Sequence, residues 1–509
     1  MTHTIVSSPR LLSTGIEGLD DVLHGGLAAG GLYSIEGDTG AGKTTLCLQF
    51  LLAGREAGES VMIITLSESA ADLRSMARSH GWDLEGVEIL ELLASAESLG
   101  PEGHYTMFHP SEIELTETTR AIFEACTRLR PKRVVLDSVG ELRLLAQSSL
   151  RYRREIIALK HFFTTNDATV LMVDDPRGEN LELAISSIAS GIIALEREAT
   201  EYGSFRRRLQ VLKMRGREVR EGYHDCRIVR GGIDVFPRLV AAEHTTSYAR
   251  ESVKSGLAAL DSLLGGGLAR GTSSLFLGPA GTGKSSLAAQ YARAAAERGE
   301  HAVIFLFDEA IATYLERSAG LGFDVQKLVD EGRILLRQVD PAELAPGEFA
   351  SLVRRIVEQN DTRVVVIDSL TGYLNAMPSE KLLALHLHEL LTYLGGKGVT
   401  TIMLMAQHGL VAASGDSPID ASYLADTVLL LRFFEANAEV CIAVSVIKKR
   451  TGKHERTIRE LRFGDGHISI GEPITGFQGV LSGTPHFVAE VAKSDGRRAR
   501  ADRRAQPRK

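Results

Sequence analysis

Two short glycine-rich stretches carry residue types that bind phosphate groups. Residues 37–45 read GDTGAGKTT and residues 278–286 read GPAGTGKSS, and both satisfy the spacing G-x-x-x-x-G-K-[ST]. In this pattern backbone N–H groups turn toward phosphate oxygens, the lysine reaches the β- and γ-phosphates, and the hydroxyl faces Mg²⁺. The candidate nucleotide-binding residues are therefore Gly40, Ala41, Gly42, Lys43, Thr44 and Thr45, and Gly281, Thr282, Gly283, Lys284, Ser285 and Ser286.

Acidic residues that could complete such sites follow later apolar runs. Asp137 ends RVVLD and Asp368 ends RVVVID, where a carboxylate would be a second Mg²⁺ ligand, the alternative being a helix cap. Glu68 and Glu309 follow the next apolar run after each loop and could orient or deprotonate water, the alternative being a solvated strand end. We expect the strand before each glutamate to run alongside the phosphate loop.

The elements that position these residues occur twice. TGIEGLDDVLHGGLAAG (14–30) aligns with SGLAALDSLLGGGLARG (255–271), and the shift of 241 residues also brings Lys43 onto Lys284 and Glu68 onto Glu309. A register kept over more than fifty residues indicates a duplicated domain. The repeat predicts domains at 1–247 and 248–490, followed by a basic, disordered tail at 491–509.

Each copy alternates short apolar runs with helical patterns. GLYSIEG (31–37) is typical of a buried strand, TTLCLQFLLAGREAG (44–58) has helical periodicity and stops at Gly58, and SVMIITLSE (60–68) indicates the next strand. Such alternation predicts an α/β fold with a mainly parallel sheet covered by helices on both faces.

Composition limits the class of protein. The chain has 509 residues, 44% hydrophobic and 24% charged, and a net charge of −7. The acidic body argues against broad nucleic-acid binding, although the last twenty residues are basic. None of the four cysteines is in CxxC spacing, and neither a signal peptide nor an apolar run of membrane-spanning length is visible. A cytoplasmic protein without a membrane segment is expected.

These residues resemble the RecA-type ATPases and, within them, the KaiC family, from about Thr14 to about Pro485. The resemblance lies in residues 16–30, ARSHGWDL (77–84), VLKMRG (211–216), VIKKRTGKHERTIRE (446–460) and GVLSGTPHFV (479–488), and above all in the tandem arrangement. It implies two tandem RecA-like P-loop NTPase domains that bind ATP and Mg²⁺ between the subunits of a homohexamer of two stacked rings.

The resemblance also assigns roles to individual residues. It implies that basic strand residues reach the phosphates of the neighbouring subunit, namely Lys213 and Arg215 in the first copy and Lys448 and Arg450 in the second, and that Met214 also contacts the nucleotide. Ser79 and His454 match further nucleotide contacts. The resemblance gives the catalytic candidates as Glu68, Asp308 and Glu309 together with Lys43 and Lys284.

The sequence departs from the family at its catalytic glutamates and at its phosphorylation pair, and also at Val219 and Ile442, where the family carries a histidine and an arginine. The family has two adjacent glutamates after the second strand, whereas this chain has Ser67 and Asp308 in place of the first of them. We therefore expect slower hydrolysis in the first domain, the alternative being that Glu68 alone suffices. The family's adjacent Ser–Thr phosphorylation pair is matched by Ser422 and Tyr423. A phenol oxygen lies further from the backbone than a threonine oxygen, so Ser422 is the candidate acceptor; alternatively, both hydroxyls only end a helix or pack at an interface.

The expected function is an ATP-hydrolysing ring protein with serine autokinase activity in the second domain, acting in signalling or timing. A signalling protein could bind its C-terminal loop or tail. The alternatives are a RecA/RadA-like DNA-dependent ATPase and a scaffold that uses ATP only to assemble. DNA binding needs basic or aromatic channel loops, whereas residues 174–186 and 412–426 contain more acids than bases.

Overall fold

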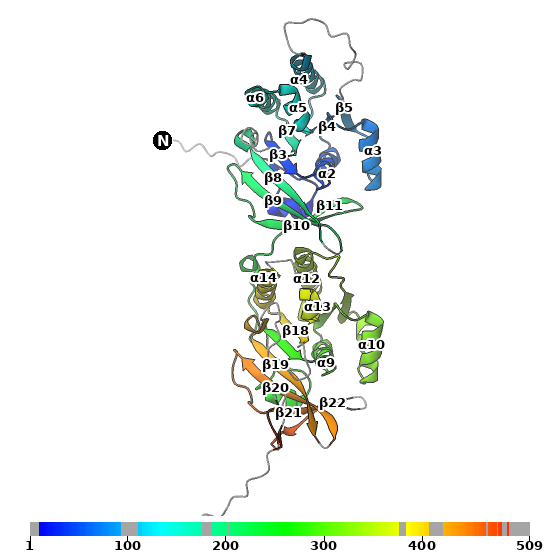
Figure 1. Ribbon diagram of the computed structural model, residues 1–509, viewed down its shortest axis with the longest axis vertical. Coiled ribbons are helices and arrows are strands. Elements are labelled where there is room, and N and C mark those ends of the chain that lie inside the picture. The colour runs from blue at the N-terminus through cyan, green and yellow to red at the C-terminus, as the bar shows by residue number, and fades with distance from the viewer. Residues whose placement is uncertain are drawn as a thin grey trace, which may run out of the picture. The chain divides into compact units, whose positions relative to one another are not determined.

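Figure 1 shows the structure, which is a computed structural model. It describes residues 10–92, 110–175, 186–200, 203–375, 383–406, 421–436, 438–464, 467–475, 477–480 and 486–487. The chain divides into two compact units, Met1–Leu239 with Ala342–Leu352, and Val240–Pro341 with Val353–Lys509, called here the first and second domains. The domain limits inferred from the repeat stay predictions, and the basic tail lies outside the described residues.

The first domain is built on a nine-stranded sheet in the order β11-β10-β9-β8-β3-β7-β6-β4-β5. The strands from β8 to β5 in this order run parallel, and β9, β10 and β11 continue the sheet beyond β8, each antiparallel to the strand before it. The strands are β3 Leu32–Gly37, β4 Val61–Thr65, β5 Val87–Glu91, β6 Arg133–Asp137, β7 Thr169–Asp174, β8 Gly191–Glu198, β9 Arg206–Met214, β10 Tyr223–Val229 and β11 Gly232–Phe236, with the short pair β1 Leu11–Leu12 and β2 Leu27–Ala28.

Helices cover both faces of this sheet (Figure 1). α1 Glu17–Val22, α2 Lys43–Glu56 and α3 Ala70–Ser79 pack on one face, and α4 Pro110–Leu129, α5 Val139–Ala146 and α6 Ser149–Thr165 pack on the other. Because side chains alternate along a strand, Ile63 of β4 enters the first core whereas Met62 and Ile64 enter the second. α2 ends as the sequence predicts, since Gly58 follows with a φ of 75° and donates its N–H to the Arg55 carbonyl at 2.9 Å.

The second domain repeats this topology strand for strand, with the order β16-β15-β17-β18-β14-β19-β20-β21-β22. The strands are β14 Ser273–Gly278, β15 His301–Leu306, β16 Ile334–Gln338, β17 Thr362–Asp368, β18 Thr400–Ala406, β19 Thr427–Ala436, β20 Glu439–Lys449, β21 Arg459–Gly464 and β22 His467–Pro473, with the short strands β12 Ser252–Val253, β13 Leu268–Ala269, β23 Phe477–Gln478 and β24 His486–Phe487. The predicted duplicated, mainly parallel α/β fold is therefore confirmed.

The helices that follow residue 240 in the chain repeat the same plan. They are α8 Ala258–Leu263, α9 Lys284–Glu297, α10 Ile311–Gly320, α11 Val325–Asp330, α12 Pro346–Asn360, α13 Leu370–Asn375 and α14 Leu383–Gly396, with 3-10 turns at η2 Ala241–His244 and η3 Ala421–Tyr423. α9 is buried along most of its length and packs with α8, α10 and α11 on one face of the sheet. In the part of the chain that the structure describes, no helix is both long enough and apolar enough to cross a bilayer.

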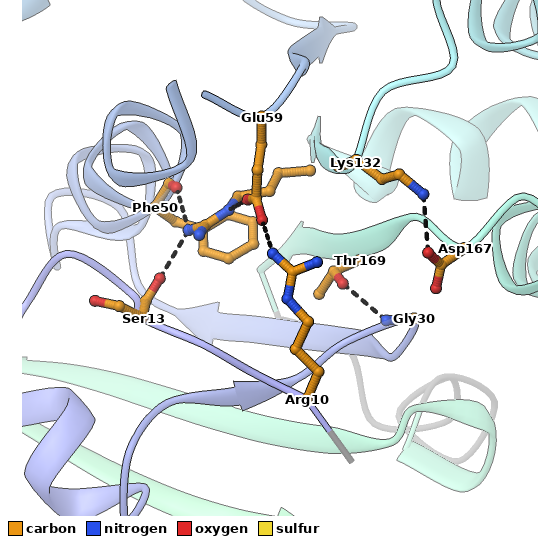
Figure 2. A network of polar contacts seen from close by, with 9 residues as sticks. Arg10, Ser13, Gly30, Phe50, Glu59, Lys132, Asp167 and Thr169 are labelled. Atoms are coloured by element: carbon orange, nitrogen blue, oxygen red, sulfur yellow. Dashed lines mark hydrogen bonds and ion pairs between the residues drawn. The ribbon is translucent and has the colours of Figure 1, made fainter. Parts of the chain in front are cut away.

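Arg133, at the start of β6, connects the N-terminal segment of the first domain to its central sheet. Its guanidinium is buried, donates to Glu59 at 2.6 Å and to the carbonyls of Ser13 and Phe50 at 2.7 and 2.9 Å, and stacks over the Phe50 ring. Figure 2 shows Arg10 reaching the same Glu59 carboxylate, at 2.7 Å. The buried charge is thus compensated by a carboxylate and two carbonyls, which such a group requires.

A partly buried ion pair in the first domain has an apolar counterpart in the second. Arg143 of α5 donates to both carboxylate oxygens of Asp174, at the end of β7. Asp174 pairs in register with Glu36, and Met405 pairs with Leu277, the residue 241 positions after Glu36. Met405 therefore replaces Asp174 in the second domain. Leu374 replaces Arg143, because each lies six residues after the aspartate that ends its strand.

Candidate nucleotide sites

Both glycine loops connect a central strand to a buried helix. The first loop leaves β3 at Gly37 and enters α2 at Lys43, and the second leaves β14 at Gly278 and enters α9 at Lys284. The residue before each helix is a glycine in the left-handed region, with φ of 110° at Gly42 and 82° at Gly283, and neither helix has a side-chain cap. The first N–H groups of each helix therefore face the loop, as an anion site requires.

Each loop lysine folds back over its own loop. Lys43 Nζ donates to the carbonyls of Gly37 and Asp38, the latter at 3.0 Å. Lys284 Nζ donates to the carbonyls of Gly278 and Pro279 at 2.8 and 2.7 Å. Burial lowers the pKa of Lys284 to about 8, although the nearby Asp368 carboxylate opposes this effect. The lysines lie where a phosphate group on the loop could replace the carbonyls.

A hydroxyl and a carboxylate meet beside each loop. Thr44 Oγ1 donates to Asp137 Oδ2 at 2.8 Å, and Ser285 is hydrogen-bonded to the Asp368 carboxylate. Burial raises the pKa of both aspartates, and these hydroxyl bonds act against it. Asp368 Oδ2 is buried without a hydrogen-bond partner in the described structure. A hydroxyl with one carboxylate, completed by phosphates and water, suits Mg²⁺, so these residues fit the expected ion.

Glu68 carries an unsatisfied carboxylate near this pair. Its backbone is fixed by Thr65, whose Oγ1 accepts from the Glu68 N–H at 3.0 Å and donates to its carbonyl at 2.7 Å. Glu68 Oε2 is buried without a partner, and its pKa is raised by burial, then by the charges of Asp137 and Asp72. A half-buried carboxylate with a raised pKa and a free oxygen is a candidate general base.

The expectation that the strand before each glutamate borders the loop strand is wrong. β7 and β6 lie between β3 and β4, and β18 and β17 lie between β14 and β15. Each glutamate nevertheless remains electrostatically coupled to the aspartate of its own site, because it stands just beyond a strand that pairs with the aspartate's strand. Parallel strands that end at one edge bring such residues together even when they are not immediate neighbours.

The glutamate of the second domain is held differently. Arg317 of α10 donates to both oxygens of Glu309, with its Nε at 3.2 Å and its Nη2 at 2.8 Å. The position 241 residues earlier holds Met76, so the first domain lacks this cation. Asp308 accepts from Ser369 Oγ at 2.5 Å and, like its counterpart Ser67, is exposed.

Arg317 is not among the site residues predicted from the sequence. No motif marks it, and the only signal was an arginine at a position where the other copy has a methionine. Its role becomes visible only when α10 packs against the loop helix, where its Nη1 also lies 3.4 Å from Ser286 Oγ.

The basic residues expected to act on a neighbouring subunit lie far from their own loop. Met214 pairs with Gly191, where β8 begins, whereas the loop follows Gly37, where β3 ends. Lys213 donates to the Ser186 carbonyl and Arg215 to the Ser187 carbonyl at 2.5 Å. The pKa of Lys213 is lowered by burial, then by the positive charges of Arg215 and Lys160. These cations gather at the opposite edge of the sheet from their own nucleotide loop.

The second domain repeats this arrangement next to the predicted acceptor. Lys448 Nζ donates to the Ser422 carbonyl at 2.8 Å, and Arg450 donates to the Tyr423 carbonyl at 3.0 Å. Ser422 is half-buried and Tyr423 is exposed. Both precede β19, and therefore stand at the edge opposite to Lys284.

Two further predicted nucleotide contacts belong to other elements of the fold. Ser79 ends α3 and donates to the Met76 carbonyl at 2.7 Å, and His454 lies in the coil after β20. Most of the segments 174–186 and 412–426, and part of 479–488, lie outside the described residues.

Comparison with known proteins agrees with this geometry. The model of the KaiC ATPase family matches residues 12–240 and again residues 253–474. The circadian clock oscillator protein KaiC of Picosynechococcus is 26% identical over 496 residues, covering 96% of this chain and 95% of that protein. The Synechococcus elongatus protein of the same name is 27% identical over 498 residues (97% and 94%), and that of Prochlorococcus marinus 28% over 489 residues (94% and 96%).

Proposed function

The chain belongs to the KaiC family of ATPases, and from its two sites we propose that each domain binds ATP with Mg²⁺ and that the second domain also phosphorylates Ser422. The observation that carries the proposal is the duplicated set of a loop lysine, a hydroxyl–aspartate pair and a glutamate. Because relatives are named clock oscillator proteins, we place the activity in signalling or timing.

In the first domain the chain's own groups divide the work of hydrolysis. Lys43 holds the phosphates, and Thr44 and Asp137 would hold Mg²⁺, which supplies positive charge to the phosphate oxygens. Glu68 Oε2 accepts the proton of the attacking water or orders that water, since it is the acceptor left free. Removing such a base costs about 10²–10⁴ in rate.

In the second domain the ion pair with Arg317 engages both oxygens of Glu309. A carboxylate already occupied by two N–H donors is a weaker acceptor for a water proton. We therefore propose that the first domain is the faster hydrolase, which reverses the expectation based on Ser67. Slower hydrolysis in the second domain leaves the γ-phosphate available for transfer to a hydroxyl.

Transfer to Ser422 would take place between subunits. Ser422 and the basic residues beside it stand at the sheet edge opposite to their own loop, which supports the proposal that the loop of another copy meets them. The same argument applies to Lys213 and Arg215 in the first domain. We propose a ring, with the family's hexamer as the expected size, in which each loop faces the basic edge of the next copy.

The test combines γ-labelled ATP with variants of each site. Free phosphate is counted separately from protein-bound label for the wild type, Glu68→Gln, Lys284→Ala, Ser422→Ala and Tyr423→Phe. We expect Glu68→Gln to lower phosphate release, Lys284→Ala and Ser422→Ala to abolish bound label, and Tyr423→Phe to retain it. Light scattering with and without ATP measures the assembly.

Other outcomes would contradict the proposal. Free phosphate without bound label would remove the kinase activity and leave an ATPase. ATP-dependent assembly without phosphate release would favour the scaffold. Phosphate release that depends on single-stranded DNA would favour the DNA-dependent ATPase.

A further inference from the structure

An arginine lies directly against the first phosphate loop. Arg197 belongs to β8, the strand beside β3, two residues beyond Leu195, which pairs with Gly37. A Cβ atom placed on Gly40 would stand 2.7 Å from Arg197 Nη1. The guanidinium therefore packs on the middle of the loop, at the position whose backbone N–H groups surround phosphate oxygens.

This arginine has no anionic partner in the described structure. Its Nε is buried without a hydrogen bond, and so is the Nε of Arg207. The two arginines are direct cross-strand partners between β8 and β9. Like charges placed opposite each other destabilise a sheet, and buried donors without acceptors cost free energy. An anion bound at the loop would reduce the repulsion between the two arginines and would accept hydrogen bonds from the Arg197 guanidinium.

An aromatic ring holds the guanidinium in place. The Arg197 guanidinium carbon lies 3.7 Å from the centroid of Phe205, and that of Arg207 lies 6.0 Å from it. Stacking on a ring fixes the plane of a guanidinium while leaving its N–H donors available for other groups. Nearby Arg208, by contrast, is close to Asp225 at 3.8 Å and to Glu198 at 4.0 Å.

The second domain has a different residue at this place. Leu195 stands against Gly37 as Leu431 stands against Gly278, so Phe433 corresponds to Arg197. Phe433 also lies against its loop, since its Cζ is 3.6 Å from a Cβ placed on Gly281. The first loop thus faces a cation and the second an aromatic ring. No motif in the sequence indicates this difference between the two loops.

We propose that Arg197 binds the polyphosphate of the nucleotide in the first domain from within the same chain, with Phe205 and Arg207 as positioning residues. The second domain, with Phe433, lacks this contact. The inference rests on the proposed nucleotide binding at both loops and adds a difference between them. Arg197 makes the first domain the tighter site for a nucleoside triphosphate.

The test measures equilibrium binding of MgATP and of tripolyphosphate by titration calorimetry. Lys284→Ala silences the second loop, and Arg197→Phe is then added because phenylalanine is the residue that the second domain accommodates there. We expect about 10–100-fold weaker binding of both ligands, as for loss of a charge-assisted hydrogen bond. Arg208→Phe is the matched control and should change affinity less than about threefold.

The reverse exchange is the complementary experiment. With Lys43→Ala silencing the first loop, Phe433→Arg should tighten binding by the second domain. If the two lysine variants themselves leave binding unchanged, nucleotide binding at the loops fails as a whole. If each lysine variant removes binding at its own loop only, while Arg197→Phe behaves like Arg208→Phe, the inference about Arg197 alone fails. A changed assembly state with unchanged affinity would assign Arg197 to a subunit interface instead, and would overturn it.

Discussion

Nucleotide binding to the second loop should be accompanied by uptake of a proton at alkaline pH, because of Lys284. Burial holds the pKa of this ammonium at about 8. At pH 9 only about one tenth of the side chains is then protonated in the nucleotide-free protein. Phosphate oxygens beside the lysine favour its charged form and raise the pKa. Binding at pH 9 should therefore take up about 0.9 proton, and at pH 7 only about 0.1.

The same shift fixes the sign of a stability change. The pKa of Lys284 is lower in the folded protein than the ordinary 10.5, so the unfolded chain binds more protons between about pH 8 and pH 10.5. The stability of the nucleotide-free second domain therefore rises with pH through this window. Below about pH 8, the buried Lys284 charge lowers the stability of the folded domain by about 3 kcal/mol, and bound phosphate would offset this loss.

Calorimetric titration with MgATP at pH 9, in two buffers of different ionisation enthalpy, measures the uptake directly. The protein carries Lys43→Ala so that only the second loop binds. Lys284→Arg is the matched control, because a guanidinium stays protonated throughout this range and should give uptake near zero. Uptake below about 0.2 proton at pH 9, or equal uptake in the Lys284→Arg protein, would refute the reasoning.

Three further outcomes are expected. Arg317→Met, which installs the residue of the first domain, should raise phosphate release by the second domain up to about fivefold in a steady-state assay, since it frees the glutamate from a partly exposed pair; unchanged or slower release would contradict this. Asp174→Ala should lower the free energy of unfolding of the first domain by about 1–3 kcal/mol, because it leaves the half-buried Arg143 without its partner, whereas Arg143→Leu with Asp174→Met should restore it to within about 1 kcal/mol. Urea unfolding followed by the fluorescence of Trp82, the only tryptophan, measures both. Turnover by the first domain should fall on acidification with a midpoint above the ordinary glutamate value of 4.5, because the pKa of Glu68 is raised and its basic form is lost earlier; a pH–rate profile lacking that step in Glu68→Gln checks the assignment.

Much of each loop could be predicted because its residues are close in sequence. The spacing from Gly37 to Thr44 sets the loop, the start of α2 and the direction of its N–H groups within a single turn. Asp137 was also within reach, since an aspartate that ends a buried parallel strand stands at the edge where the loop lies. The shift of 241 residues between the two copies then predicted the corresponding residues of the second site.

Other features depend on how distant segments cross the sheet. The sequence could not show that β7 and β6 separate β3 from β4, because a helical crossover can skip any number of strands. It could not place Lys213 at the far edge from its own loop, because that follows from the antiparallel turn of β9 against β8.

The sequence by itself determined the two glycine loops and the helix that follows each of them, because their short spacing lies on one strand–loop–helix unit that leaves the backbone little choice. It identified the aspartates and glutamates only as residues at strand ends, and the fold then brings Thr44 to Asp137, which is 93 residues away. Only the tertiary structure decided how the two sites differ. Arg317 meets Glu309, and Arg197 meets Gly40, through packing of elements that are separate along the chain. Side-chain partnership of this kind depends on helix orientation and strand register, which a single sequence does not specify residue by residue.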